Sequence, residues 1–184
     1  MRLVLLDLEF ENQSTRERDI IQIGAVEVDL VTGEILPFFN EFVALPQGEV
    51  LSTFISRLTG ISKDEVASAR SAEEVFRDFW KAFRRADVDG NLSAWGDDAE
   101  WIRQESRRHG VRIPTKVTDI DIKKMFQFFR LQRGLGTREK TGLINTLEAF
   151  DLGFEGRHHN AYDDAYNTAR LLLQALRSPD PQDP

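Results

Sequence analysis

The sequence contains no cysteine, and this absence removes three kinds of chemistry. Disulfide bonds, thiolate-ligated zinc sites and cysteine nucleophiles all require a thiol. The chain also has no apolar run of the roughly 18 residues that a membrane-spanning helix needs. Its first residues, MRLVLLDLEFE, pass from a short apolar run directly into acids, which is unlike a secretory signal. We therefore expect a cytoplasmic protein without a membrane partner.

The composition is that of an ordinary globular protein, but the charge is unevenly distributed. A chain of 184 residues with 41% hydrophobic content is long enough to bury one core. The net charge is −7, yet residues 103–140 contain eleven Lys or Arg and four acids, a local charge of +7 that leaves −14 for the rest. A basic region in an acidic protein could steer a polyanion, or it could be a solvated helical face. The charge count leaves both possibilities open.

The order of apolar patterns predicts an α/β domain with a mixed sheet. A buried strand is expected over RLVLLDLEF, and alternation on both sides of LVTGE predicts a hairpin that turns at Gly33. A short strand is expected at NLSAW. Helical segments are expected over residues 51–66 (with a capping box of Ser62 and Glu65), 71–85, 97–110, 121–132, 141–153 and about 160–176. We predict one domain, residues 1–177, and a polar, Pro-rich, disordered tail, residues 178–184.

Acids lie where two of these strands end. Asp7 and Glu9 close the first strand and share one face, while Leu8 points to the other. Two neighbouring carboxylates repel each other unless a cation lies between them. Asp97 and Asp98 follow the strand NLSAW and open a helix. By itself each pair has a plain explanation, either a solvated strand end or acids that complement a helix dipole.

A third group of titratable residues precedes and opens the last predicted helix, in GRHHNAYDDA. Asp164 lies on the helix face that should turn inward, where a buried aspartate needs a partner, and His159 stands five residues earlier. Asp163 is expected to be exposed and His158 solvated. Oxygen ligands without cysteine favour hard cations such as Mg²⁺ or Mn²⁺. A cluster of four carboxylates would fit two such ions.

The segments DLEF, WGDDAEWI and HHNAYDDA, in this order, resemble the three motifs of the DEDDh 3′–5′ exonucleases, the DnaQ-like branch of the RNase H-like fold. DIIQIGAVEVD and FISRLTGIS resemble further segments of that family, and the KapD and enhanced-RNAi exonucleases are the most similar branch. The resemblance implies a central mixed five-stranded sheet flanked by helices. The chain departs from the family at Phe10, where proofreading enzymes usually carry threonine, and at Ala99, where this branch often carries aspartate.

The resemblance also assigns roles to individual residues. It implies that Asp7, Glu9, Asp98 and Asp164 hold two Mg²⁺ or Mn²⁺ ions, with Asp97 as the alternative to Asp98. His159 would be the general base, and nearby carboxylates are expected to raise its pKa above the ordinary value near 6.5. Leu8 and Phe10 would contact the terminal nucleotide; the alternative is that both belong to the core.

The implied function is metal-dependent 3′–5′ exonuclease activity on single-stranded RNA or DNA, with RNA favoured, releasing nucleoside 5′-monophosphates from the 3′ end. Two alternatives remain. One is a phosphodiesterase specific for short oligonucleotides, as in oligoribonucleases. The other is a regulatory module that keeps the fold and binds nucleic acid without turnover. The sequence does not distinguish substrate, processivity, oligomeric state or protein partners.

Overall fold

A mixed five-stranded sheet forms the centre of the protein, in the order β3-β2-β1-β4-β5. The computed structural model describes all residues except 13–17, 133, 135, 137–140 and 178–184, so the predicted disordered tail lies outside the described residues. The strands are β1 (Arg2–Asn12), β2 (Arg18–Asp29), β3 (Ile35–Phe42), β4 (Asn91–Ala94) and β5 (Thr118–Asp121). The first three are antiparallel, β4 is parallel to β1, and β5 is parallel to β4. The predicted mixed five-stranded sheet is confirmed.

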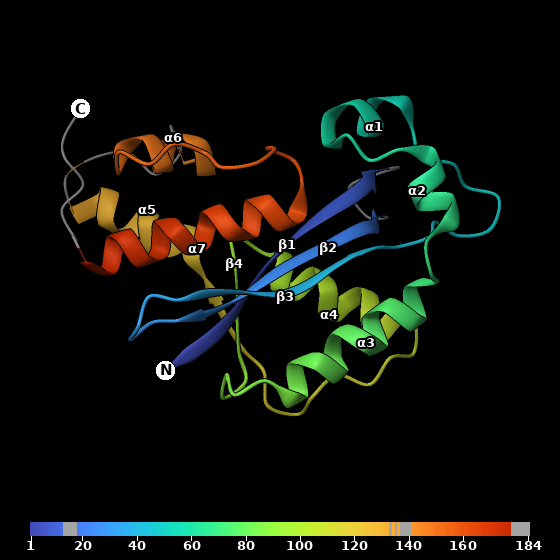
Figure 1. The fold of residues 1–184 in the computed structure, drawn as a ribbon, viewed down its shortest axis with the longest axis horizontal. Helices are drawn as coiled ribbons and strands as arrows, with labels where there is room; N and C mark the ends of the chain where they lie inside the picture. Colours follow the sequence, from blue (N-terminus) through green and yellow to red (C-terminus); the bar gives the residue numbers. More distant parts are fainter. Residues whose placement is uncertain (13–17, 133, 135, 137–140, 178–184) are drawn as a thin grey trace.

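Helices cover both faces of this sheet (Figure 1). They are α1 (Thr53–Thr59), α2 (Lys63–Ser68), α3 (Ala72–Arg85), α4 (Asp98–Arg108), α5 (Ile122–Gln132), α6 (Leu143–Ala149) and α7 (Ala161–Arg177). On one face α7 lies across the sheet with α5 and α6 beside it, and α3 and α4 cover the other face (Figure 1). Among the described residues, no helix is long and apolar enough to cross a membrane.

The pleat of β1 divides the interior into two cores. Val4, Leu6 and Leu8 pack with α3 and α4, whereas Leu3 and Leu5 pack with α5, α6 and α7. Alternate residues of a strand point to opposite faces, so the odd-numbered positions of β1 lie on the α7 side. Asp7 and Glu9 continue this odd-numbered row. The strand thereby directs both acids toward the first turn of α7.

Local sequence signals match the structure where they act within one element. Gly33 adopts φ +76° at the hairpin turn, and its N–H donates to the carbonyl of Asp29 at 2.8 Å. Ser62 and Glu65 form the predicted capping box at the start of α2. The apolar stripe of α3 is buried along its whole length. β5 was not predicted, because the sequence TDID has little apolar content and the strand lies at the sheet edge with mostly exposed residues.

Much of the positive charge between residues 103 and 140 is paired with nearby acids. The cation–acid pairs are Arg103 with Glu100 and Asp119, Arg107 with Glu100, Arg108 with Asp19 and Glu105, Lys116 with Asp89, and Lys124 with Asp121. Residues 133, 138 and 140 lie outside the described part of the chain. Paired cations contribute less long-range field, so the described part of this region attracts a polyanion less strongly than its residue count suggests.

Candidate active site

The middle of β1 supplies two acids to one small cluster. The prediction that Asp7 and Glu9 close this strand is wrong, because its pairing with β2 continues to Asn12. Asp7, Glu9 and Asp164 each offer a carboxylate oxygen, and these three atoms lie within 4.8 Å of one another. Glu9 is 8% exposed and Asp164 is 5% exposed, so this is no solvated strand end. The prediction that Asp7 and Glu9 share a face and that Asp164 turns inward is therefore confirmed. Three carboxylates at this separation require protons or cations between them.

The second motif brings Asp98 beside the same cluster. Asp98 opens α4, and its carboxyl lies close enough to that of Asp7 to raise the Asp7 pKa. The backbone N–H of Leu8 also faces the Asp98 carboxylate. Asp97 is exposed, and its Oδ2 accepts a hydrogen bond from Nε1 of Trp101 at 3.2 Å. Of the two aspartates, Asp98 therefore adjoins the cluster at Asp7, whereas Asp97 is exposed beside Trp101.

The first turn of α7 is docked directly on β2. Gly24 pairs with Asp7 across the β1–β2 ladder, and a Cβ added there would lie 2.0 Å from the backbone nitrogen of Tyr162. Only glycine permits the helix backbone to approach the strand this closely. Gln22, which pairs with Glu9, accepts a hydrogen bond from the N–H of Ala161 at 3.1 Å. This docking brings Asp164 over the acids of β1.

The loop before α7 is held by side chains of that helix. The N–H of His159 donates to Oδ2 of Asp164 at 2.9 Å, and the N–H of Arg157 donates to Oδ2 of Asp163 at 2.7 Å. Asn167, which is fully buried, accepts from the N–H of Glu155 and donates to its carbonyl. Asp163 is half-buried, so the prediction that it would be exposed is wrong: it anchors the loop instead.

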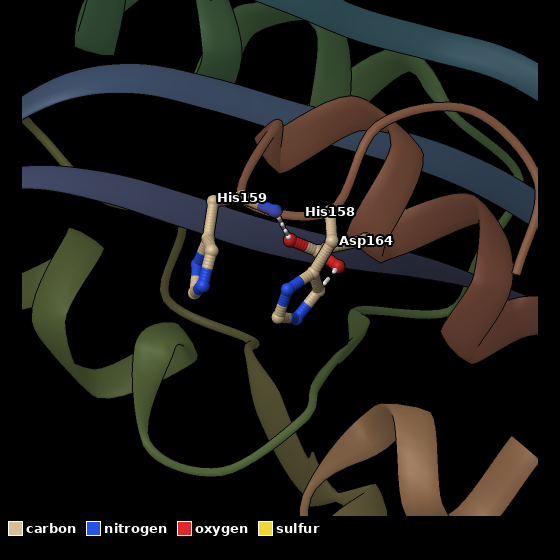
Figure 2. A group of neighbouring side chains, drawn as sticks. All are labelled: His158, His159 and Asp164. Carbon is tan, nitrogen blue, oxygen red and sulfur yellow. Dashed lines mark hydrogen bonds and ion pairs between the residues drawn. The ribbon is translucent and has the colours of Figure 1, made fainter. Parts of the chain in front are cut away.

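Both histidines belong to the site region. Figure 2 shows the two imidazoles on the same side of the loop, with the carboxylate of Asp164 beside them. Their ring centroids lie 3.9 Å apart, and His158 also contacts the ring of Phe154 edge-on. His159 has φ +64°, an uncommon conformation for a residue with a Cβ. His158 is 39% exposed in its side chain but is in contact on two sides, so it is less solvated than expected.

Burial and mutual repulsion raise the pKa of every carboxyl in the cluster. Burial raises the pKa of Glu9 to about 8, with added repulsion from Asp164 and Asp98. Burial, with repulsion from neighbouring aspartates, raises the pKa of Asp98 to about 7 and that of Asp164 to about 6, and raises the pKa of Asp7 well above its ordinary value. Without counter-ions the site therefore holds protons at neutral pH.

The expected upward shift of the His159 pKa is wrong. Burial lowers the pKa of this imidazole below 6.5, and the neighbouring charge of His158 lowers it further. Asp164 acts in the opposite direction but is the smallest of the three influences. The sequence indicated the carboxylates but not the partial burial of the loop. His159 is consequently neutral at pH 7 and able to accept a proton.

Leu8 and Phe10 have different surroundings. Leu8 is 5% exposed and packs in the core with α3 and α4, so it presents its backbone to the site. Phe10 is half-buried, and its ring meets that of Trp101 edge-on at a centroid distance of 6.0 Å. The guanidinium of Arg18 lies 5.7 Å from the Phe10 ring and 5.0 Å from the Trp101 ring. Contact of Leu8 or Phe10 with a nucleotide stays a prediction.

Sequence reasoning missed the residues that position the site. The sequence pattern places Gln22 and Gly24 in a strand and Asn167 in a helix, without a further role. One signal was available for Gly24, because an isolated glycine within a strand pattern often marks a close backbone approach. Gln22 interrupts the apolar run DIIQIGAV, which is a weaker signal. The partners of Asn167 lie in an irregular loop whose path the sequence pattern does not predict.

The chain is similar to known exonucleases over nearly its whole length. Residues 4–172 match the model of the RNase T exonuclease family. The chain is 26% identical to ERI1 exoribonuclease 2 of Danio rerio over 95% of its own length and 34% of the relative, and 27% identical to 3′-5′ exonuclease Snipper of Drosophila melanogaster over 88% and 62%. The chain thus spans less than two thirds of the length of these curated relatives.

A solved structure matches the fold of nearly the whole chain. It is the nuclease domain of 3′hExo, described as a DEDDh family member bound to rAMP. The TM-score is 0.81 at 23% sequence identity, and the match covers 96% of this chain and 92% of that one. At this level of identity the likeness concerns the fold.

Proposed function

The chain belongs to the RNase T exonuclease family, and on this premise we propose that it is a metal-dependent 3′–5′ exonuclease. Its substrate would be single-stranded RNA or DNA, and its product a nucleoside 5′-monophosphate. The observation that carries the proposal is the convergence of acids from three separate elements on one buried cluster beside His159. A module that only bound nucleic acid would have no use for these repelling acids.

The donor set fits hard divalent cations. Asp7, Glu9, Asp98 and Asp164 offer carboxylate oxygens alone, which suits Mg²⁺ or Mn²⁺. Their raised pKa values indicate a site short of positive charge, which bound cations would supply. When bound, two such ions would lower the pKa of an attacking water and stabilise the leaving 3′-oxygen.

The protein's own groups orient the reaction and take up the proton. His159 would accept the proton of the attacking water, since its lowered pKa keeps the imidazole neutral at pH 7. The hydrogen bond from its N–H to Asp164 fixes the base next to the acids. Once ionised, the four carboxylates would repel a phosphodiester, so the ionised cluster binds substrate only after cations neutralise its charge. This accounts for nuclease chemistry in an acidic protein.

RNA is the favoured substrate. ERI1 exoribonuclease 2 is named for RNA, and the similar nuclease domain of 3′hExo is bound to rAMP. The name of Snipper specifies a 3′-5′ exonuclease without a sugar, so DNA stays open. A cytoplasmic location and the single domain of residues 1–177 also stay predictions. Because the chain spans only part of its relatives, their whole-protein substrates and partners do not transfer directly.

The test is digestion of 5′-labelled single strands of RNA and DNA with matched sequences, each in a short and a long form. Reactions contain Mg²⁺, Mn²⁺ or EDTA, and His159→Ala serves as the control variant. The proposal predicts a ladder that shortens from the 3′ end and disappears with EDTA and with the variant. Cleavage of short strands alone would indicate an oligonucleotide phosphodiesterase. Binding without cleavage of any strand would indicate the non-catalytic module.

A further inference from the structure

A second candidate metal site adjoins the carboxylate cluster and shares Asp164 with it. His158, His159 and Asp164 each offer one ligand atom, and these atoms lie within 4.8 Å of one another. Figure 2 shows that the imidazole rings of His158 and His159 extend from the loop before α7 on the side where the Asp164 carboxylate lies. The group is chemically different from the carboxylate cluster, since two of its three ligands are imidazole nitrogens.

Oδ1 of Asp164 is the oxygen that such a site would use, in competition with the carboxylate cluster. Oδ2 accepts the N–H of His159, but Oδ1 is buried and, in the described part of the chain, has no hydrogen-bond partner. Its neighbour on this side is Nε2 of His158, at 3.9 Å. Buried carboxylate oxygens are normally satisfied, and an unsatisfied one calls for an explanation such as an ion. The orphaned oxygen thus faces the extra histidine.

The two groups of ligands differ in the ions they select. Imidazole nitrogens suit Zn²⁺ and neighbouring transition metals, whereas carboxylate oxygens alone suit Mg²⁺ and Mn²⁺. Zn²⁺ commonly takes three protein ligands from histidine and aspartate and leaves its fourth position open. We propose that His158, His159 and Asp164 form a Zn²⁺ site that inhibits the enzyme.

Inhibition follows from the two residues that both sites share, and this part rests on the proposed function. An imidazole nitrogen of His159 that binds Zn²⁺ cannot accept a proton from water. An Asp164 carboxylate drawn toward the histidines is no longer available to Asp7 and Glu9. Zn²⁺ should therefore inhibit even when Mg²⁺ is in excess. His158 has no part in the proposed hydrolysis, so its replacement separates the two sites.

The test begins with calorimetric titration of the metal-free full chain with Zn²⁺. We compare the wild type with His158→Gln and with His109→Gln. His109 is the third histidine of the chain, located at the end of α4 against the ring of Phe76, and so gives a matched loss of one imidazole elsewhere. His158→Gln should bind Zn²⁺ at least about tenfold more weakly, since losing even an outer partner of a metal ligand costs roughly 10–100-fold. His109→Gln should bind like the wild type.

The second measurement is titration of Zn²⁺ into the hydrolysis reaction with Mg²⁺. Wild type and His109→Gln should be inhibited, and His158→Gln should need at least about tenfold more Zn²⁺. Absence of Zn²⁺ binding to the wild type, or equal binding by His158→Gln, would overturn the site. The second result would place Zn²⁺ among the carboxylates instead. If the wild type hydrolyses nothing with Mg²⁺ or Mn²⁺, the proposed function fails, while the calorimetry still decides the Zn²⁺ site.

Discussion

The backbone N–H of His159 donates to Oδ2 of Asp164 at 2.9 Å, although His159 has the uncommon φ of +64°. This one hydrogen bond joins the loop that carries the proposed base, His159, to the helix that carries Asp164. Strained backbone persists where surrounding contacts determine it, and such positions often belong to functional sites. The relationship makes the position of the imidazole depend on the docking of α7.

The two aspartates of the second motif should differ sharply on substitution. Asp98→Asn removes a carboxylate from the cluster, and we expect hydrolysis to fall by roughly 10²–10⁴-fold, since a bound ion supplies several kcal/mol to the transition state. Asp97→Asn keeps an oxygen that can accept from Trp101 and should stay within a few-fold of the wild type. Initial rates on labelled RNA decide between them, and a severe loss in Asp97→Asn alone would reverse the assignment.

Substitution of Gly24 by alanine should disturb the site from its supporting side. The new Cβ would lie 2.0 Å from the Tyr162 nitrogen. The nearest atoms belong to the backbone of Ala161 and Tyr162, which cannot move aside by a change of side-chain rotamer. Overpacking of this kind costs about 1–3 kcal/mol, or about 2–4 °C of Tm per kcal/mol in a chain of this size. The activity should fall as well, because Asp164 moves with α7.

The matched control for Gly24→Ala is Gly153→Ala. A Cβ at Gly153 would have no neighbour within 4 Å, and its φ lies outside the left-handed range. Thermal unfolding of both variants measures the difference. Equal Tm values for the two would show that the close approach of α7 to β2 does not constrain this protein.

Asp163 should act on hydrolysis through His159. Asp163→Ala removes the acceptor of the Arg157 N–H and frees the loop, so we expect kcat to fall roughly tenfold to a hundredfold, as displacements near 1 Å can do. KM and metal binding should change little, because the carboxylate cluster is intact. Asp163→Asn retains an acceptor oxygen and should restore most of the rate.

A double-mutant cycle tests this dependence directly. If Asp163 acts by holding His159, then Asp163→Ala combined with His159→Ala should be no slower than His159→Ala alone. A multiplicative loss in the double variant would mean that Asp163 contributes by another route.

The pKa values of the cluster predict an unusual pH dependence of stability in EDTA. The folded-state pKa values are raised from 4.5 to about 8 for Glu9, and from 3.8 to about 7 for Asp98 and about 6 for Asp164. A raised pKa means that the folded state holds the proton more tightly. This contribution to stability is complete below the ordinary pKa values and is lost as pH rises through the folded ones.

We therefore expect Tm in EDTA to fall between pH 5 and pH 8.5, and Mg²⁺ to raise Tm more at the higher pH, where the acids are ionised and bind it. Thermal unfolding at several pH values, with and without Mg²⁺, measures both effects. A Mg²⁺ effect that was equal at the two ends of this range would contradict the coupling of metal binding to deprotonation.

The sequence predicted those features that depend on local pattern. The hairpin at Gly33, the capping box at Ser62 and the buried stripe of α3 all follow from neighbouring residues, and the structure confirms them. The motifs also identified the acids within β1 and α7. The resemblance to the DEDDh exonucleases that these motifs indicated is confirmed by the family match.

Features that depend on tertiary contacts could not be predicted from the local sequence pattern. Which of the adjacent residues Asp97 and Asp98 turns toward the cluster depends on the direction in which α4 leaves β4. The sequence pattern does not predict that direction. β5 lacks an apolar pattern because it lies at the edge of the sheet. The direction of the His159 pKa shift depends on burial of an irregular loop, and the role of Asp163 depends on the path of that loop.

One variant, Asp164→Asn, tests the proposed role of the acids through both stability and hydrolysis. If the acids repel one another in the folded chain and bind catalytic metal ions, the variant in EDTA at pH 8 should unfold at the same temperature as the wild type or higher, because one buried charge is gone. With Mn²⁺ it should hydrolyse 5′-labelled RNA roughly 10²–10⁴-fold more slowly. A folded variant with full activity would show that Asp164 does not bind a catalytic metal ion.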